Sequence, residues 1–92
     1  MIRSWGDSAT RRLFETGKSK WTGLDAVKAL EALAILRASP SMAPLAALRQ
    51  FRLHKLTGNR KDQWSISVGG PWRIVFRFRD SEFHDVQIVD YH

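Results

Sequence analysis

Two runs of alternating apolar and polar residues, separated by a short glycine–proline break, constrain the fold of this chain more than any other feature. Residues 64–68 read Trp-Ser-Ile-Ser-Val, and residues 72–78 read Trp-Arg-Ile-Val-Phe-Arg-Phe. Because side chains of a strand alternate between its two faces, this period of two predicts two strands that each bury one face. Gly69, Gly70 and Pro71 separate the runs and predict a tight reversal. The two runs are therefore expected to form a β-hairpin.

The second run of the hairpin has one apolar and one basic face. On the basic face Arg73 and Arg77 flank Val75. Exposed arginines are most often simply solvated, so this face becomes a candidate site only if other reactive groups join it. The apolar face is expected to carry Trp72, Ile74, Phe76 and Phe78.

The N-terminal half of the chain predicts an edge strand and a first helix. Residues 1–5 read as a short edge strand that feeds directly into the helix. Asp7 or Ser8 can cap this helix, because a short side-chain oxygen satisfies its first free amide groups. Gly17 suits the left-handed turn that follows a helix. Leu13 and Phe14 are expected to face inward.

A second helix is expected over residues 24–38. Thr22 to Asp25 resembles a capping box with Asp in place of Glu. Ser39-Pro40 should end the helix, because the residue before a proline avoids the helical region. Its apolar stripe toward the sheet, spaced i, i+3, i+4, is expected to comprise Leu24, Val27, Leu30, Leu33 and Ala34, with Arg37 as a further candidate.

The remaining segments complete an α+β domain. We expect an irregular helical turn over residues 42–48, a strand over 51–56, a turn over 57–60, a loop over 80–85 and a last strand over 86–91. Two N-terminal helices then pack on one face of a small, antiparallel-rich sheet, and the other face forms a concave, basic surface. With 92 residues, the chain is expected to be one domain spanning 1–92.

Composition narrows the partners and the compartment. The chain has no cysteine, no apolar run near the ~20 residues that span a bilayer, and no signal-peptide pattern, so we expect a cytoplasmic protein without a membrane partner. Its net charge is +6, which favours a polyanion or an acidic protein as partner. No acidic residue interrupts the basic stretch of Arg49, Arg52, Lys55, Arg60 and Lys61.

The three histidines differ in context. His84 follows Glu82 and precedes Asp85 in the predicted polar loop, so we interpret it as solvated. His54 lies in a predicted strand within the basic stretch; a lone strand histidine is usually structural. His92 follows Asp90 and Tyr91 where the last strand ends, which would hold all three at the sheet surface.

These residues suit metal-independent RNA cleavage. The reaction needs a base for the 2′-hydroxyl, an acid for the leaving 5′-oxygen, and a cation for the phosphate. Two histidines, or a histidine with Asp or Tyr, could move the protons, and the Arg73 guanidinium fork matches phosphate oxygens. Tyr91 or Trp72 could stack on a base. The histidines and Asp90 lack metal-ligand spacing, so no metal or cofactor is expected.

Several segments in register resemble the HigB toxins of the RelE/ParE toxin–antitoxin superfamily. They are Leu13-Phe14-Glu15-x-Gly17, Leu53-His54, Leu56-x-Gly58-x-Arg60, Trp64-Ser65-Ile66-x-Val68, Trp72-Arg73-Ile74-x-Phe76 and Val89-Asp90-Tyr91-His92. The resemblance implies a RelE-like microbial RNase fold and a ribosome-dependent mRNA interferase that cuts mRNA in the A site and arrests growth. It also implies a HigA-type helix-turn-helix antitoxin, through which alone the toxin meets operator DNA.

Carried over residue by residue, the resemblance assigns an active site of His54, Arg73, Asp90, Tyr91 and His92. Contacts to RNA or the ribosome are expected from Arg52, Lys55, Arg60, Lys61, Trp72 and Arg77. Thr57 and Gly69 depart from relatives that carry basic residues there, which bears on RNA grip and codon preference.

Two alternatives stay open at this point. The chain could be a gyrase-inhibiting toxin on the same fold, although titratable residues at the terminus argue for a nuclease. It could also be a non-catalytic RNA- or DNA-binding module that uses its basic patch for phosphates alone.

Overall fold

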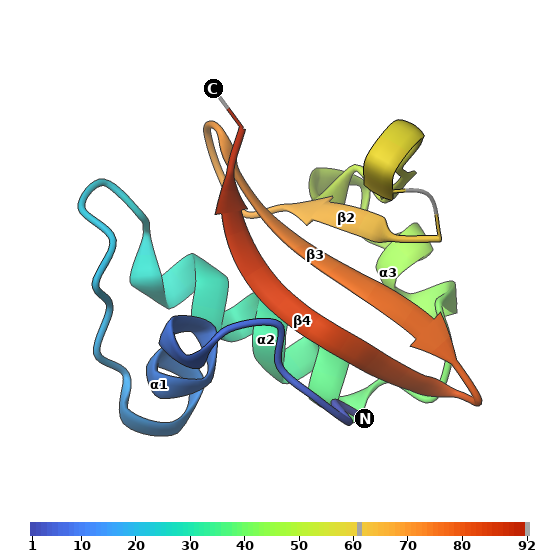
Figure 1. Cartoon of the computed structure of the whole chain (residues 1–92), viewed down its shortest axis with the longest axis horizontal. Helices are drawn as coiled ribbons and strands as arrows, with labels where there is room; N and C mark the ends of the chain where they lie inside the picture. Colours follow the sequence, from blue (N-terminus) through green and yellow to red (C-terminus); the bar gives the residue numbers. More distant parts are fainter. Residues whose placement is uncertain (61, 92) are drawn as a thin grey trace.

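Four antiparallel strands form one sheet, in the order in which they occur along the chain (Figure 1). The computed structural model describes residues 1–60 and 62–91. The strands are β1 (His54–Lys55), β2 (Trp64–Ser67), β3 (Trp72–Arg79) and β4 (Glu82–Asp90). The α-helices are α1 (Ser8–Thr16), α2 (Ala26–Ala38) and α3 (Ala43–Ala47), and short 3-10 turns cover Arg49–Phe51 and Gly58–Arg60. The predicted α+β class, with helices packed on an antiparallel sheet, is confirmed.

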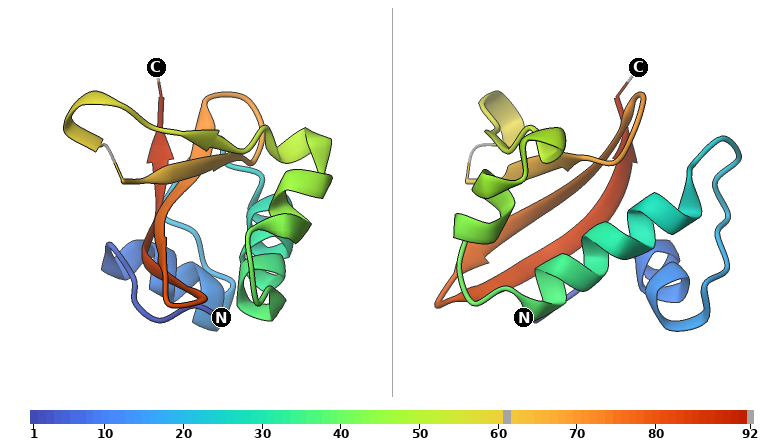
Figure 2. Two further views of the ribbon diagram at one scale, coloured as in Figure 1. Left: turned by 90° about the vertical axis from the view of Figure 1, so that its right-hand side faces the viewer. Right: turned by 180° about the vertical axis from the view of Figure 1, so that it is seen from behind.

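The predicted hairpin forms β2 and β3. Ser65 pairs with Val75 and Ser67 with Arg73. Gly69 (φ 103°) occupies a backbone region that other residues rarely adopt, which explains a glycine at this reversal. Helices α2 and α3 lie on one side of the sheet, as both views in Figure 2 show, and α1 lies at the outer edge of β4 beside α2. The core between the two layers includes Leu33 and Leu36 from α2 and Ile66, Ile74 and Phe76 from the sheet.

Helix α1 has the predicted caps at both ends. The Asp7 carboxylate accepts a hydrogen bond of 2.8 Å from the amide of Thr10. Gly17 (φ 77°) adopts the left-handed conformation and its amide bonds to the Leu13 carbonyl. Leu13 is fully buried, and Phe14 packs against the core from a half-buried position. The inward direction predicted for both side chains is thus confirmed.

Helix α2 differs from the prediction at its start and in its buried face. Asp25 is itself the N-cap, accepting from the amide of Lys28, so the expected capping box from Thr22 is wrong. Val27 is 67% exposed, so the predicted apolar stripe is wrong there too. Because apolar residues surround most of this helix, periodicity alone admitted two registers. The register that packs is Ala29, Ala32, Leu33 and Leu36.

The strand predicted over residues 51–56 shrinks to β1, His54–Lys55. Phe51 instead ends a 3-10 turn as a buried residue, and Arg52 follows it in a left-handed conformation (φ 47°, ψ 51°). A left-handed residue cannot continue an extended strand, so pairing begins only after it. The helical turn predicted over 42–48 is confirmed as α3, with Pro44 in its first turn.

The loop predicted over residues 80–85 is also wrong. Asp80 and Ser81 form a two-residue reversal in which both have positive φ angles, 53° and 64°. Such a turn matches the twist of a hairpin, so β4 can start at Glu82 and pair with β3 almost at once. His84 therefore lies in a strand rather than in a loop, facing Arg77 across the sheet.

The N-terminal residues lie along the outer edge of β4. Isolated parallel bridges join Ile2 to Phe83 and Trp5 to Val86, so the predicted edge position holds, although no continuous strand forms. The register of β3 and β4 shifts between Val75 and Arg77, and Asp85 has a positive φ of 54° at this bulge. Within the described residues, no helix is long and apolar enough to cross a membrane.

Candidate active site

The register of the sheet places His54 and Arg73 on the same face. His54 pairs with Ser65, and Ser65 pairs in turn with Val75. Arg73 lies two residues before Val75 on β3 and therefore shares its face. This face is opposite to the one that packs against the helices. We call it the open face.

A shallow pocket of about 430 Å³ collects the reactive groups of the open face. It is lined by Arg52, Leu53, His54 and Arg73. The turn before β1 supplies Arg52 and Leu53, β1 supplies His54, and β3 supplies Arg73. The left-handed conformation of Arg52 turns the chain into β1 and places its side chain on the wall of the pocket. An imidazole and two guanidinium groups thus line a pocket that has no acidic residue in its wall.

Tyr91, directly after β4, contacts Arg73, one of the residues that line this pocket. Its amide donates a hydrogen bond of 2.8 Å to the Pro71 carbonyl in the β2–β3 reversal. The Arg73 Cζ lies 6.0 Å from the centre of the Tyr91 ring, within the range of a cation–π contact. Tyr91 is 40% exposed, so part of it remains open to solvent. Guanidinium and phenol are therefore held next to each other.

Asp90 is placed differently from its neighbours. It pairs with Trp72 on β3, whereas Val89 pairs with Arg73. Alternation along β4 puts Asp90 on the opposite side of the sheet from Arg73. His92, the other residue expected from the terminal motif, lies outside the described residues.

Of the residues predicted to bind RNA, one lines the pocket and others lie away from it. Arg52 is in the pocket with His54. Lys55 alternates to the other face, with its Nζ 5.8 Å from the Trp64 ring. Arg60 bonds to Gln63, and Trp72 packs against the core from a half-buried position.

Arg77 is engaged away from the pocket. Its Nη1 lies 3.1 Å from the Asp85 carboxylate, at the bulge of β4. Lys61, which was also predicted to bind RNA, lies outside the described residues. The basic residues predicted to bind RNA therefore do not all lie in one pocket.

Two features of the site were missed in the sequence. The open face is predicted to be a concave, basic surface, yet Ser65 and Val75 on it are 1% and 0% exposed. The sequence predicts Pro71 only as part of a turn, yet its carbonyl also accepts the hydrogen bond from the Tyr91 amide. The sequence does contain an indication of this burial. The outward positions of residues 64–68 are both serine, whereas longer polar side chains would suit a solvent-exposed face.

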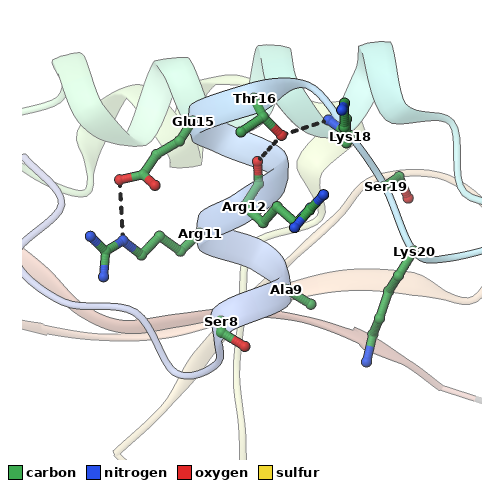
Figure 3. Close-up of a pocket in the computed structure, with 9 residues that line it drawn as sticks. All are labelled: Ser8, Ala9, Arg11, Arg12, Glu15, Thr16, Lys18, Ser19 and Lys20. Carbon is green, nitrogen blue, oxygen red and sulfur yellow. Dashed lines mark hydrogen bonds and ion pairs between the residues drawn. The ribbon is translucent and has the colours of Figure 1, made fainter.

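A larger hollow lies elsewhere, beside α1 (Figure 3). It measures about 810 Å³, and Arg12 and Lys20 extend along it. Its carboxylate, Glu15, forms an exposed ion pair with Arg11. This hollow contains none of the residues predicted for catalysis, so we place the candidate site at the smaller pocket. No group of three or more His, Cys, Asp or Glu within residues 1–60 and 62–91 could hold a metal ion.

Comparison with known proteins identifies relatives over the whole chain. A family of HigB-like toxins, described as the RelE-like toxin of the type II toxin–antitoxin system HigB, matches residues 3–92. The protein Endoribonuclease HigB of Proteus vulgaris is 31% identical over 94 residues, covering 100% of both chains.

Solved structures provide a comparison of the fold. YafQ from E. coli strain BL21(DE3) superimposes with a TM-score of 0.65 at 15% identity, covering 98% of this chain and 93% of that one. A mutant of E. coli YafQ superimposes with a TM-score of 0.61 at 14% identity and the same coverage. At these identities the likeness concerns the fold alone.

Proposed function

Because the chain belongs to the HigB-like toxins, the RelE-like toxins of type II toxin–antitoxin systems, we propose that it is an endoribonuclease that cuts mRNA in the ribosomal A site and halts translation. The observation that carries the proposal is the pocket uniting His54 with Arg52 and Arg73. Imidazole exchanges protons near neutral pH, and guanidinium donors fit phosphate oxygens. These groups suit proton transfer at a phosphodiester.

The proposed reaction transfers the phosphoryl group within the RNA. A base removes the proton of the 2′-hydroxyl, and the 2′-oxygen bonds to phosphorus while the bond to the 5′-oxygen breaks. An acid gives its proton to that 5′-oxygen, leaving a 2′,3′-cyclic phosphate and a 5′-hydroxyl. Arg73 donates to the non-bridging oxygens, where charge is greatest in the transition state. Protein and RNA supply every proton and electron pair, so the proposal includes no cofactor.

We assign the roles of the individual residues as the resemblance to the HigB toxins implies. His54 serves as base or acid, and we assign the other role to His92. Tyr91, whose ring lies against Arg73, positions the phosphate or stacks on a base. We assign Asp90 to orienting or tuning a histidine. Arg52 adds a second cation inside the pocket.

The outer basic residues contribute to RNA or ribosome binding in this proposal. Four basic residues flank β2 along the chain: Lys55, Arg60, Lys61 and Arg77. Trp72, which is predicted to bind RNA with them, precedes Arg73 at the start of β3. They would contact phosphates or bases beyond the scissile one, where charge rather than exact geometry sets affinity. The net charge of +6 supports a polyanionic target.

As a type II toxin, the protein has an antitoxin as its partner. We propose that this is a HigA-type protein with a helix-turn-helix domain, and that the toxin meets operator DNA only through it. The site of action is then the cytoplasm, where ribosomes and mRNA occur.

The test is expression of wild type, His54→Gln and His84→Gln in a bacterial host, with primer extension on a translated and an untranslated copy of one message. His84→Gln is the matched control, because His84 lies on β4 at the Arg77 pair, outside the pocket. Wild type and His84→Gln should arrest growth and leave new 5′ ends in the translated copy only. His54→Gln should do neither.

Other outcomes would redirect the proposal. Growth arrest without new 5′ ends would reject the nuclease and point to a different toxin target such as gyrase. Cuts in the untranslated copy would reject the requirement for the ribosome while keeping the nuclease.

A further inference from the structure

Ser65 is a buried polar residue that the fold does not use. It is 1% exposed, in the middle of β2. Within residues 1–60 and 62–91, its Oγ is the one buried side-chain polar atom without a hydrogen-bond partner. The other buried polar side chains of that part of the chain each make a hydrogen bond; they are Thr10, Ser39 and Gln63. A buried hydroxyl without a partner destabilises a fold, so its presence calls for another role.

The position of Ser65 indicates which group it can serve. Ser65 pairs directly with His54 across β1 and β2, and both side chains lie on the open face. Side chains of such a pair have Cβ atoms about 4.5–5.5 Å apart. A serine Oγ and an imidazole Nδ1 can close that gap to hydrogen-bonding distance when both side chains turn toward each other. No other described side chain pairs with His54 across the sheet, because β1 is an edge strand.

We propose that Ser65 is the positioning residue of His54. Its hydroxyl bonds to Nδ1 of the imidazole when RNA occupies the pocket, which directs Nε2 at the ribose and phosphate. A hydroxyl has one donor and two acceptor positions, so it can hold the ring both before and after Nε2 exchanges its proton. The exposed ring of His54 then has one fixed orientation over the substrate instead of several. This inference rests on the proposed nuclease function and adds a residue to it.

The decisive variants are Ser65→Ala and, as a matched control, Ser67→Ala. Ser67 lies on the same strand and the same face, two residues further on, and its Oγ accepts a weak hydrogen bond from the Gly69 amide. Both substitutions remove one hydroxyl from β2, but only Ser65 faces His54. The purified proteins are compared by thermal unfolding, by cleavage kinetics on programmed ribosomes, and by NMR of ¹⁵N-labelled histidine side chains.

The expected result separates stability from activity. Ser65→Ala should unfold at the same temperature as wild type or a higher one, because the substitution removes a buried hydroxyl that has no partner. Its kcat should fall about 10- to 100-fold with KM nearly unchanged, since loss of orientation affects the reacting geometry rather than binding. Ser67→Ala should keep the wild-type kcat.

The NMR measurement reports on the contact itself. With a non-cleavable 2′-deoxy oligonucleotide bound, the His54 nitrogen signals of wild type should show Nδ1 in a hydrogen bond, and Ser65→Ala should lose that signature. His54→Gln identifies the signals.

Three results would overturn the inference. They are an unchanged kcat in Ser65→Ala, a lower unfolding temperature that makes the hydroxyl structural, and identical His54 signals in both proteins. Failure of the nuclease proposal is separately visible, because wild type itself would then cut no RNA.

Discussion

Replacing Thr10 by valine should destabilise the protein measurably, because Thr10 holds α1 to β4 through one buried hydrogen bond. The amide of Ile88 donates to the Thr10 Oγ1 at 2.9 Å, between residues 78 positions apart. Thr10 is 0% and Ile88 3% exposed, so water cannot replace the lost acceptor. Valine has nearly the shape of threonine, which leaves packing intact and isolates the hydrogen bond.

The size of this effect follows from the unsatisfied amide. Leaving a buried donor without a partner costs about 1–3 kcal/mol. For a domain of this length, each kcal/mol lowers the melting temperature by roughly 4–8 °C. The matched control is Thr10→Ser, which keeps the acceptor and removes one methyl group, at about 0.8 kcal/mol by burial area. Urea unfolding followed by circular dichroism gives both free energies.

The comparison of the two variants decides the matter. Thr10→Val should be less stable than Thr10→Ser despite its better apolar packing. If Thr10→Val were as stable as Thr10→Ser, the hydrogen bond from Ile88 would not anchor α1, and the docking of α1 would have to be ascribed to packing alone.

Three further substitutions test the site and the edge of the sheet. Arg73→Lys keeps the charge but loses the planar fork, so cleavage should fall by about 10²-fold or more with little change in stability; equal rates would remove Arg73 from phosphate contact. Gly6→Ala brings a Cβ to 2.8 Å from the Asp85 carbonyl oxygen, so unfolding in urea should show a loss of about 1–3 kcal/mol, and an unchanged midpoint would refute the close approach. Asp85→Asn removes the charge of a half-exposed ion pair with Arg77, so the free energy of unfolding should fall by only about 0–1 kcal/mol, and this difference from wild type should shrink as salt is added. A larger loss of stability that does not change with salt would mean that the carboxylate holds the bulge by other contacts.

The parts of the fold that the sequence predicts well are those set by local chemistry. Asp7 and Gly17 mark the two ends of α1, because cap residues act within one turn of the helix. The hairpin of β2 and β3 follows from alternation and a glycine reversal. The sequence predicts a longer loop in place of the two-residue turn at Asp80 and Ser81, because the turn contains no glycine and a positive φ is uncommon for serine.

The sequence predicts less well those features that depend on contacts between distant segments, such as the buried face of α2 and the grouping of the site residues. The residues around α2 offer two apolar registers, and contact with the sheet selects Ala29 and Leu33 over Val27. At the site, the motif identifies His54 and Arg73, but only the register of three strands brings them into one pocket. Ser65 read as an ordinary outward position of a strand, because neither its burial nor its missing partner is visible without neighbours.

The bridges between the N-terminal residues and β4 have a consequence for the order of folding. The sheet is a meander, so β2, β3 and β4 can pair by closing short loops. Ser4 and Asp85, in contrast, are 81 positions apart, and closing a loop of that length costs about 4 kcal/mol of chain entropy. We therefore expect the meander to form first and the N-terminal segment to dock last. In pulsed hydrogen exchange the amides of β3 should gain protection before the amide of Gly6, which bonds to the Val86 carbonyl. Simultaneous protection would instead indicate that both ends of the chain meet in the folding nucleus.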